Sequence, residues 1–194
     1  MNTVGIVLAA GASRRMGSPK ALLRGPDGVP LAARQAASLR AGGCGSVAVV
    51  VGSQAQEVRR GLPEGVRVVE NPRWAQGRAT SLQAGIGAFP EAEGFLFLPV
   101  DAVGVKEQTI LAILGAAETE PPAIWRPVHR GEKGNLLWVP QEAGRVLMRL
   151  PAETRVDEWA KPLARQLEVD DPAILRNINT PEEWSALLRR PPSA

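Results

Sequence analysis

The sequence is poor in cysteine and in long hydrophobic runs. Cys44 is the only cysteine among the 194 residues, which excludes an internal disulfide and a cysteine-based zinc site. The longest apolar runs, such as 47–51 and 95–100, have the length of a strand and are too short to cross a bilayer. The first residues lack the charged segment that opens a secretory signal. We therefore expect a cytoplasmic protein that does not enter a membrane.

Aromatic residues and clustered basic residues are also scarce. The chain has no tyrosine and three phenylalanines, and its net charge is +3. Its arginine pairs, at 14–15, 59–60 and 189–190, are separate from one another and form no basic stripe. Surfaces that bind nucleic acid combine such a stripe with aromatic side chains on which bases stack. We therefore expect no nucleic-acid partner.

Short apolar segments alternate with helical segments, and a hydrophobic fraction of 44% is enough for a buried core. This alternation predicts an α/β fold: a doubly wound, mostly parallel, Rossmann-like sheet in three α/β/α layers. The length suits a single domain, residues 1–190, followed by a short tail, residues 191–194.

The individual elements are predicted from apolar periodicity and from glycine and proline positions. Strands are expected at 4–10, 47–51, 66–70, 95–98, 123–128, 136–139, 167–169 and 176–178. Helices are expected from about residue 30 to Gly42, at 55–62, at 80–87 with Thr80 or Ser81 as the cap, at 107–118, 142–150, around Glu158, and at 181–188.

A glycine-rich loop follows the first strand, where residues 8–20 read LAAGASRRMGSPK. The spacing excludes a Walker A loop, because Ser18 and Pro19 separate Gly17 from Lys20, and no dinucleotide fingerprint is present. Small residues allow the backbone to approach a ligand closely, and Arg14, Arg15 and Lys20 can neutralise an anion. The loop is therefore predicted to bind phosphate, the alternative being a surface loop with solvated arginines.

Asp101 directly follows the apolar strand at 95–98. Ligands of doubly wound sheets bind beyond the carboxyl ends of the strands, so Asp101 and the glycine-rich loop are expected to face one site. Its carboxylate suits Mg²⁺, which prefers oxygen ligands, although an ordinary carboxylate at a strand end is the alternative.

The run at 8–20 resembles the signature L-A-[AG]-G-x-S-x-R-M-G-x-x-K of the MobA-like NTP transferases. This family includes the molybdenum cofactor guanylyl- and cytidylyltransferases. Four further segments resemble the family in the same order: 71–77 with Ser81 and Leu82, 98–101, 134–138 and 179–183. The resemblance covers nearly the whole chain and implies a nucleotidyltransferase, in which a substrate phosphate attacks the α-phosphorus of an NTP and pyrophosphate leaves.

The resemblance also implies roles for individual residues. Catalytic roles fall to Arg15, Lys20 and Asp101. The metal ligands, for Mg²⁺, would be Asp101 and Asn179. The nucleotide would be bound by Leu8, Ala9, Ala10, Gly11, Ser13, Arg15, Lys20 and Ser81, and the acceptor by Trp74, Gly77, Arg78 and Asn135.

The closest branch of the family, as judged from these motifs, is the cytidylyltransferase branch, which is MocA-like. Ala10 gives the loop the L-A-A-G form of that branch, and Asn135 with Trp138 matches it further. The resemblance therefore implies CTP in preference to GTP, a molybdopterin-type phosphate acceptor, and a molybdenum hydroxylase apoenzyme as a recipient of the product.

The sequence departs from the family pattern at several positions. Asp101 stands in Val-Asp-Ala-Val where Gly-Asp-x-Pro is usual, and Asn179 stands where aspartate is common. Two alternatives therefore remain: a nucleotidyltransferase for another phosphorylated small molecule, such as a sugar or polyol phosphate, or a non-catalytic cofactor-binding maturation protein of the same fold. His129, the only histidine, is expected to be a loop residue and not a base.

Overall fold

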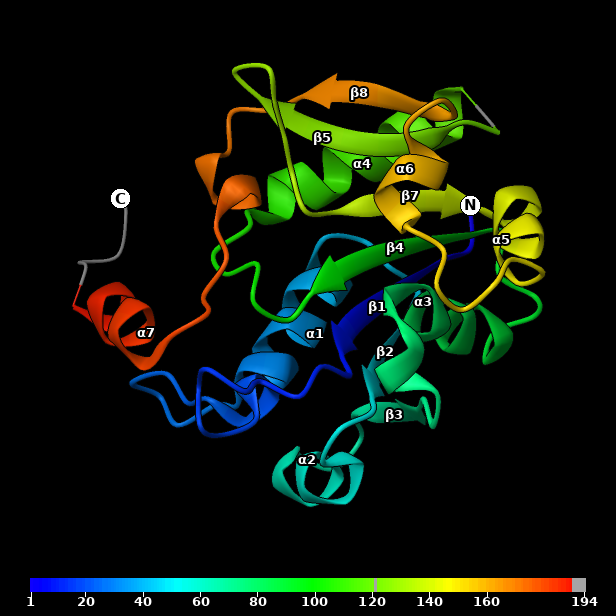
Figure 1. The fold of residues 1–194 in the computed structure, drawn as a ribbon. Coiled ribbons are helices and arrows are strands. Elements are labelled where there is room, and N and C mark those ends of the chain that lie inside the picture. The colour runs from blue at the N-terminus through cyan, green and yellow to red at the C-terminus, as the bar shows by residue number, and fades with distance from the viewer. Residues whose placement is uncertain (121, 190–194) are drawn as a thin grey trace.

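A computed structural model describes residues 1–120 and 122–189 and shows a sheet of eight strands with helices on both faces (Figure 1). The strands are β1 Thr3–Ala9, β2 Ser46–Val51, β3 Arg67–Glu70, β4 Gly94–Pro99, β5 Ile124–His129, β6 Glu132–Lys133, β7 Leu137–Pro140 and β8 Ala164–Glu168. The α-helices are α1 Leu31–Ala41, α2 Ala55–Gly61, α3 Arg78–Gly87, α4 Glu107–Thr119, α5 Gln141–Leu147, α6 Val156–Ala160 and α7 Pro181–Leu188. Short 3₁₀ helices are η1 Lys20–Leu22, η2 Trp74–Gln76 and η3 Pro172–Leu175.

The strand order is β3-β2-β1-β4-β7-β5-β6, with β8 also paired to β5. The pairs among β1 to β4 are parallel, whereas β7 is antiparallel to both β4 and β5. The chain moves from β1 outward to β3 and then returns across β1 to form β4. The order in which the chain adds strands therefore reverses between β1 and β4. The loops that follow these two parallel strands lie side by side at their carboxyl ends.

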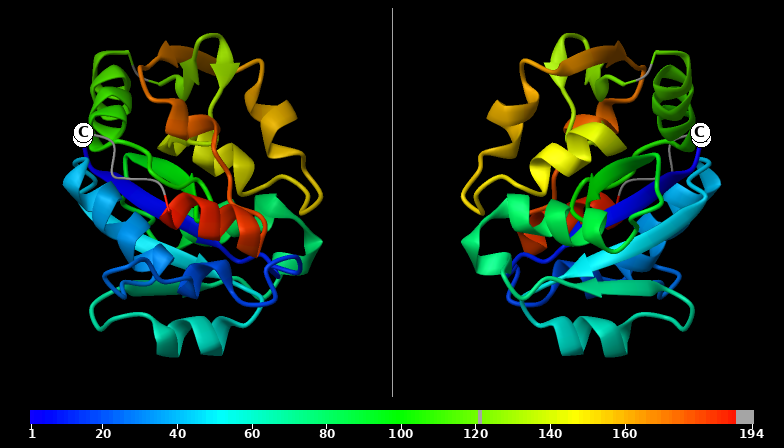
Figure 2. Two further views of the ribbon diagram at one scale, coloured as in Figure 1. Left: turned by 90° about the vertical axis from the view of Figure 1, so that its left-hand side faces the viewer. Right: turned by 90° about the vertical axis from the view of Figure 1, so that its right-hand side faces the viewer.

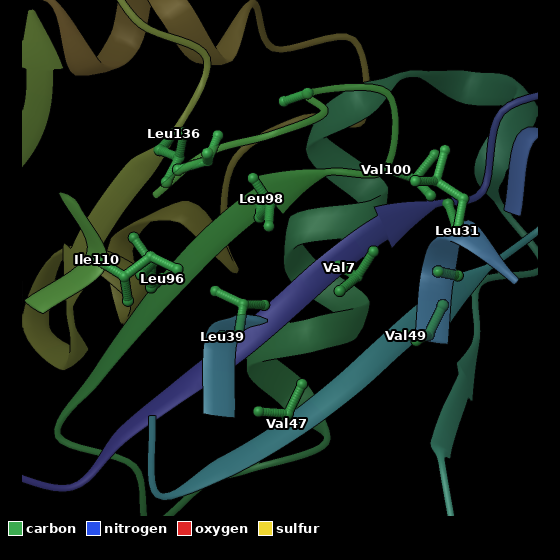
Figure 3. Packing of buried hydrophobic residues seen from close by; sticks show 14 of the residues in the cluster. Val7, Leu31, Leu39, Val47, Val49, Leu96, Leu98, Val100, Ile110 and Leu136 are labelled. Atoms are coloured by element: carbon green, nitrogen blue, oxygen red, sulfur yellow. The ribbon is translucent and has the colours of Figure 1, made fainter. Parts of the chain in front are cut away.

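The side chains of the central strands alternate between two hydrophobic cores. On one face, Val7 of β1 packs in a cluster with residues of α1, α2 and α4, as Figure 3 shows for Leu31 and Leu39 of α1. On the other face, Ile6 packs with residues of α3, α5 and α6. The left view of Figure 2 shows α1 and α4 on one side of the sheet and α3 and α6 on the other. The predicted three-layer, mostly parallel α/β fold is confirmed.

Most predicted elements are confirmed, but two predictions near the C-terminal side of the sheet are wrong. Residues 176–178 do not pair as a strand, because the backbone N–H of Ile178 donates to Asp101 O at 3.0 Å instead of joining a ladder. His129 is the last residue of β5, only 9% exposed, with Nδ1 2.9 Å from Val169 O, so it is not a loop residue. The short strand β6 lies within the predicted loop at 129–135.

The expected cap of α3 is also wrong. The helix begins after Gly77, and neither Thr80 nor Ser81 caps it with a side chain. The Thr80 hydroxyl turns back and donates to carbonyl oxygens at the start of the helix, 2.8 Å from Gly77 O. Gly77 has φ of 142°, and a Cβ there would come within 2.7 Å of Ala152 O, so only glycine fits this junction.

Cys44 is 3% exposed, and burial raises the pKa of its thiol to about 12, so it is a small packed residue of the core. In the described part of the chain, no helix combines the length and the apolar character needed to cross a membrane. The expected tail, residues 191–194, lies outside the described residues.

Candidate active site

The loop after β1 folds back on itself and places Lys20 at the carboxyl end of β4. Met16 N donates to Ser13 O at 2.8 Å, which closes a turn, and Ser13 and Gly17 have positive φ values of 49° and 70°. Ser13 Oγ accepts a hydrogen bond from Lys20 N at 3.1 Å. The predicted phosphate loop is therefore held in shape by its own serine.

Lys20 is the centre of a charged network. Its ammonium donates to Asp101 Oδ2 at 2.7 Å and to Asn179 Oδ1 at 3.0 Å. Arg15 donates to the same oxygen of Asn179 at 3.1 Å. The side chain of Lys20 is 14% exposed and that of Asp101 24%, so this ion pair is largely withdrawn from solvent. Three segments that are far apart in the sequence therefore meet at one point.

Asn179 reaches the network because the end of the chain returns to the sheet. Figure 1 shows the chain after β8 running past the central strands to α7, beside the loop that follows β1. The segment is anchored by the bond from Ile178 N to Asp101 O. Thr180 and Glu183 form a capping box at the start of α7, which holds the residue after Asn179 in place.

Two neighbouring cavities open around Asp101. The first has a volume of about 250 Å³ and is lined by Leu8, Ala9, Gly11, Ser13, Arg14, Arg15, Pro19, Lys20, Ala21, Ser53, Val100, Asp101 and Asn179. The second has a volume of about 500 Å³ and is lined by Leu8, Ala10, Gly11, Trp74, Ala75, Gly77, Arg78, Ser81, Pro99, Asp101, Asn135 and Asn177. Asp101, Leu8 and Gly11 border both cavities.

Comparison with known proteins assigns the family. The family described as the MobA-like NTP transferase domain matches residues 5–169, which is most of the chain. The chain belongs to this family. The result confirms the resemblance seen in residues 8–20, and nucleotidyl transfer is the chemistry that the family supports.

Two curated relatives and two solved structures illustrate the likeness. The chain is 37% identical over 150 residues to a bifunctional IPC transferase and DIPP synthase of Rubrobacter xylanophilus, covering 73% of this chain and 33% of that protein. It is 38% identical over 112 residues to a nicotine blue oxidoreductase of Paenarthrobacter nicotinovorans, covering 57% and 54%. The chain thus spans a third and about half of these relatives.

The crystal structure of Rv0371c from Mycobacterium tuberculosis H37Rv superposes with a TM-score of 0.81 at 26% identity, over 97% of this chain and 98% of that one. A further structure of Rv0371c, in complex with manganese, superposes with a TM-score of 0.75 at 22% identity, over 98% and 100%.

The structure of the MobA-like domain distributes the predicted site residues between the two cavities. Leu8, Ala9, Gly11, Ser13, Arg15 and Lys20 line the first cavity with Asp101 and Asn179. All four predicted acceptor residues, Trp74, Gly77, Arg78 and Asn135, line the second. Ser81 and Ala10, predicted to contact the nucleotide, lie in the second cavity as well. A nucleotide that touches all of its predicted residues therefore spans both cavities.

Several site residues were missed by sequence reasoning. Ser53 follows β2 closely and lines the first cavity, so its position after a parallel strand was an available signal. Asn177 lines the second cavity and accepts from Asn135 Nδ2 at 3.1 Å, and nothing in its sequence context indicated this. Gln35, in the middle of α1, was also missed, although it contacts the loop that carries Asp101.

The rim of the second cavity carries a separate ion-pair group. Asp157 accepts from Arg78 Nη1 at 3.2 Å and from Arg126 Nη2 at 2.7 Å. Desolvation raises the pKa of Asp157, but the hydrogen bond from Arg126 and the charges of Arg78 and Arg126 outweigh it, so the pKa lies below its ordinary value. The group holds the Arg78 side chain between the cavity and α6.

Asp101 and Asn179 fit a divalent cation that shares its ligands with a substrate. Both present oxygen atoms to one point, which Lys20 Nζ contacts in this structure. Within the described residues, no group of three or more histidine, cysteine, aspartate or glutamate side chains could hold a metal. Magnesium is commonly bound by one or two carboxylates together with phosphate oxygens and water, and this donor set suits that arrangement.

Proposed function

We propose that this protein is a magnesium-dependent nucleotidyltransferase that transfers CMP from CTP to the phosphate of a molybdopterin-type acceptor. The observation that carries the proposal is the network at the switch point between β1 and β4, in which Lys20 bonds both Asp101 and Asn179 and Arg15 bonds Asn179. Two cations and a carboxylate at this edge of the sheet match the charges of a triphosphate and its metal.

The reaction forms one bond and breaks one. A phosphate oxygen of the acceptor attacks the α-phosphorus of CTP, the bond between the α- and β-phosphates breaks, and pyrophosphate leaves. Lys20 and Arg15 neutralise the triphosphate and the leaving pyrophosphate, since such transfer depends on positioning and charge stabilisation. An already ionised acceptor phosphate needs no base, which is consistent with the burial of His129 away from the cavities.

Lys20 changes partners when the nucleotide binds. Its ammonium pairs with Asp101 in the structure, and phosphate oxygens compete for it more strongly than a single carboxylate does. Movement of Lys20 toward the phosphates frees oxygen atoms of Asp101 and Asn179 for Mg²⁺. When bound there, Mg²⁺ supplies positive charge to the reacting phosphate oxygens.

The second cavity selects the nucleotide base and the acceptor. Ala10 supports a preference for CTP over GTP, and Trp74 offers an apolar face beside Arg78 and Asn135 for the acceptor. A molybdenum hydroxylase apoenzyme is then the proposed recipient of the finished cofactor. The hydrogen-bond donors of Arg78 and Asn135 also suit a phosphorylated acceptor other than molybdopterin.

A different phosphorylated acceptor, such as a sugar or polyol phosphate, is the second candidate. The relative from Rubrobacter xylanophilus supports it, because that protein is named an IPC transferase and DIPP synthase, without reference to molybdopterin, and is 37% identical over 150 residues. The two candidates share the first cavity and differ in what fills the second.

Pyrophosphate release tests the proposal. Wild-type protein is incubated with Mg²⁺, each NTP in turn, and either molybdenum-loaded molybdopterin or a panel of sugar and polyol phosphates. We expect release with CTP and molybdopterin, and a loss of at least about 10³-fold in Asp101→Ala, because the site then lacks its carboxylate. Asp170→Ala, which removes an exposed carboxylate, serves as the control and should retain wild-type activity.

Each outcome assigns a different function. Release with a sugar or polyol phosphate alone would replace the acceptor and keep the mechanism. Equal activity of Asp101→Ala and wild type would remove Asp101 from the site. Tight CTP binding without release for any acceptor would point to an acceptor outside the panel, and absence of CTP binding would favour a non-catalytic maturation protein.

A further inference from the structure

Gln35 is a buried polar residue in the middle of α1, and it contacts the loop that carries Asp101. The residue is 3% exposed. Its side-chain nitrogen donates to Val100 O at 3.3 Å and to Ala102 O at 2.7 Å, the carbonyls on either side of Asp101. Since both partners are carbonyl oxygens, only the NH₂ of the carboxamide can serve them.

The carbonyl between these two is also held from outside the loop. Asp101 O accepts from the backbone N–H of Ile178 at 3.0 Å. Three consecutive carbonyls at the carboxyl end of β4 are thus bound, two by α1 and one by the segment that carries Asn179. A loop whose carbonyls are fixed on both sides has little freedom to move the carboxylate that it presents.

A second buried glutamine shows what such a residue does elsewhere in the fold. Gln83 of α3 is also 3% exposed, and its side-chain nitrogen donates to Leu147 O at 3.0 Å and Leu150 O at 2.9 Å. It ties the end of α5 to α3, away from Lys20 and Asp101. The two glutamines share burial and the two bonds that the side-chain nitrogen donates. Gln83 Oε1 in addition accepts from Arg73 Nη2 at 3.0 Å, and the two residues differ in what the bound backbone carries.

We propose that Gln35 is a positioning residue that sets the place of the Asp101 carboxylate, and through it the affinity of the site for a divalent cation. The inference rests on the proposed function, in which Asp101 is a metal ligand. Loss of the Gln35 amide leaves two carbonyls to find other partners, and the loop then shifts or loosens. A metal site tolerates little displacement of a ligand before affinity falls.

Gln35→Met and Gln83→Met test the proposal as a matched pair. Methionine preserves the length and approximate volume of the side chain and removes the donor. Binding of Mn²⁺ is measured by electron paramagnetic resonance in the presence of CTP, and thermal unfolding is measured in parallel. We expect Gln83→Met to lose at least as much stability as Gln35→Met, because it also removes the acceptor of Arg73. Only Gln35→Met should raise the Kd for Mn²⁺, by at least about tenfold, which corresponds to about 1.4 kcal/mol.

The outcomes separate this proposal from the function it rests on. Equal Mn²⁺ affinity in the two variants would overturn the positioning role and leave the proposed reaction intact. Absence of Mn²⁺ binding by wild type, with CTP bound, would overturn both. Should Gln35→Met fail to fold, Gln35→Asn keeps a carboxamide one methylene shorter, and a rise in its Kd for Mn²⁺ relative to Gln83→Asn is the expected result. No difference between those two would again refute the proposal.

Discussion

The two cavities that meet at Asp101 differ in charge and in size. The smaller cavity holds Lys20, Arg14 and Arg15, and its ammonium and carboxylate groups are already paired with one another. The larger cavity has few charged groups beyond Arg78 and Asp101, and it includes the broad face of Trp74. The smaller cavity suits a ligand charged strongly enough to displace its internal ion pair. The larger cavity suits a ligand recognised by its shape and by hydrogen bonds. The contrast suggests that reaction and selectivity can be altered separately.

The two cavities lie at different parts of the sheet. The smaller one sits where the parallel strands β1 and β4 end, a position that the crossover topology of the sheet creates. The larger one is completed by Asn135 and Asn177, which lie beyond the antiparallel part of the sheet and are joined by a hydrogen bond. The proposed transfer chemistry therefore lies at the parallel part of the sheet, and the proposed acceptor recognition lies beside the antiparallel part.

Among the substitutions that separate the two cavities, Lys20→Met is expected to have the largest effect, and it acts on the smaller cavity alone. Because the phosphates lose a charge-assisted partner, we expect CTP to bind at least about 30-fold more weakly and transfer to fall by about 10²-fold or more. Without nucleotide, Mn²⁺ should bind more tightly than to wild type, since the resident cation between Asp101 and Asn179 is gone. Calorimetry with CTP and electron paramagnetic resonance with Mn²⁺ measure the two effects.

The control for this experiment is Lys161→Met, which removes the same charge from an exposed residue after α6. It should match wild type in both measurements. Unchanged Mn²⁺ affinity in Lys20→Met would mean that Lys20 does not compete with the cation. The proposal that Lys20 leaves Asp101 and Asn179 to make room for the metal would then be wrong.

Asn135→Ala and Arg78→Met probe the larger cavity and should have intermediate effects. Each removes a side chain that lines this cavity, so we expect KM for the acceptor to rise about tenfold, with the Kd for CTP changing little. Steady-state kinetics at saturating CTP, together with CTP titrations, measure the split. A loss of CTP affinity as large as that of Lys20→Met would show that Asn135 and Arg78 hold the nucleotide and not the acceptor, and would break the comparison.

Asp157→Asn should have the smallest effect and concerns stability at the rim of the larger cavity. The folded pKa of Asp157 lies below its ordinary value of 3.8, so its pairing contributes fully above that pH and is lost as the pH falls through the folded pKa. The carboxylate is 59% exposed, which limits the contribution to about 1 kcal/mol or less after solvent screening. Urea unfolding at pH 7, 5 and 3.5 should show the difference from wild type shrinking at the lowest pH. A constant difference would exclude an ionic origin.

Local sequence patterns were enough to predict the regular half of the molecule. The apolar runs of β1, β2 and β4 and the helices α1 and α4 are each determined by residues within one segment, and they were predicted within a few residues. Asp101 and the glycine-rich loop were expected to face one site because parallel strands place their carboxyl ends together. In the structure, Lys20 from that loop contacts Asp101.

What escaped prediction depends on contacts between distant segments. Residues 176–178 have an extended backbone in part. The backbone N–H of Ile178 nevertheless donates to Asp101 O, 77 residues earlier in the sequence, and not to a neighbouring strand. Gln35 resembles any polar residue of a helix until the loop it contacts is known. The Thr80 hydroxyl could cap a helix or turn back to a carbonyl, and the entry of the chain through Gly77 decides between these.

The return of Asn179 to the first loop has a consequence for synthesis of the chain. A ribosome completes β1, the glycine-rich loop and β4 long before it adds Asn179, which contacts Lys20 across 159 residues of sequence. Domains fold from the N-terminal side as they emerge, so Lys20 and Asp101 can meet while the chain is still growing. The third member of the network arrives only after the segment that carries Asn179 has been synthesised, so the finished site depends on residues added long after its first two members.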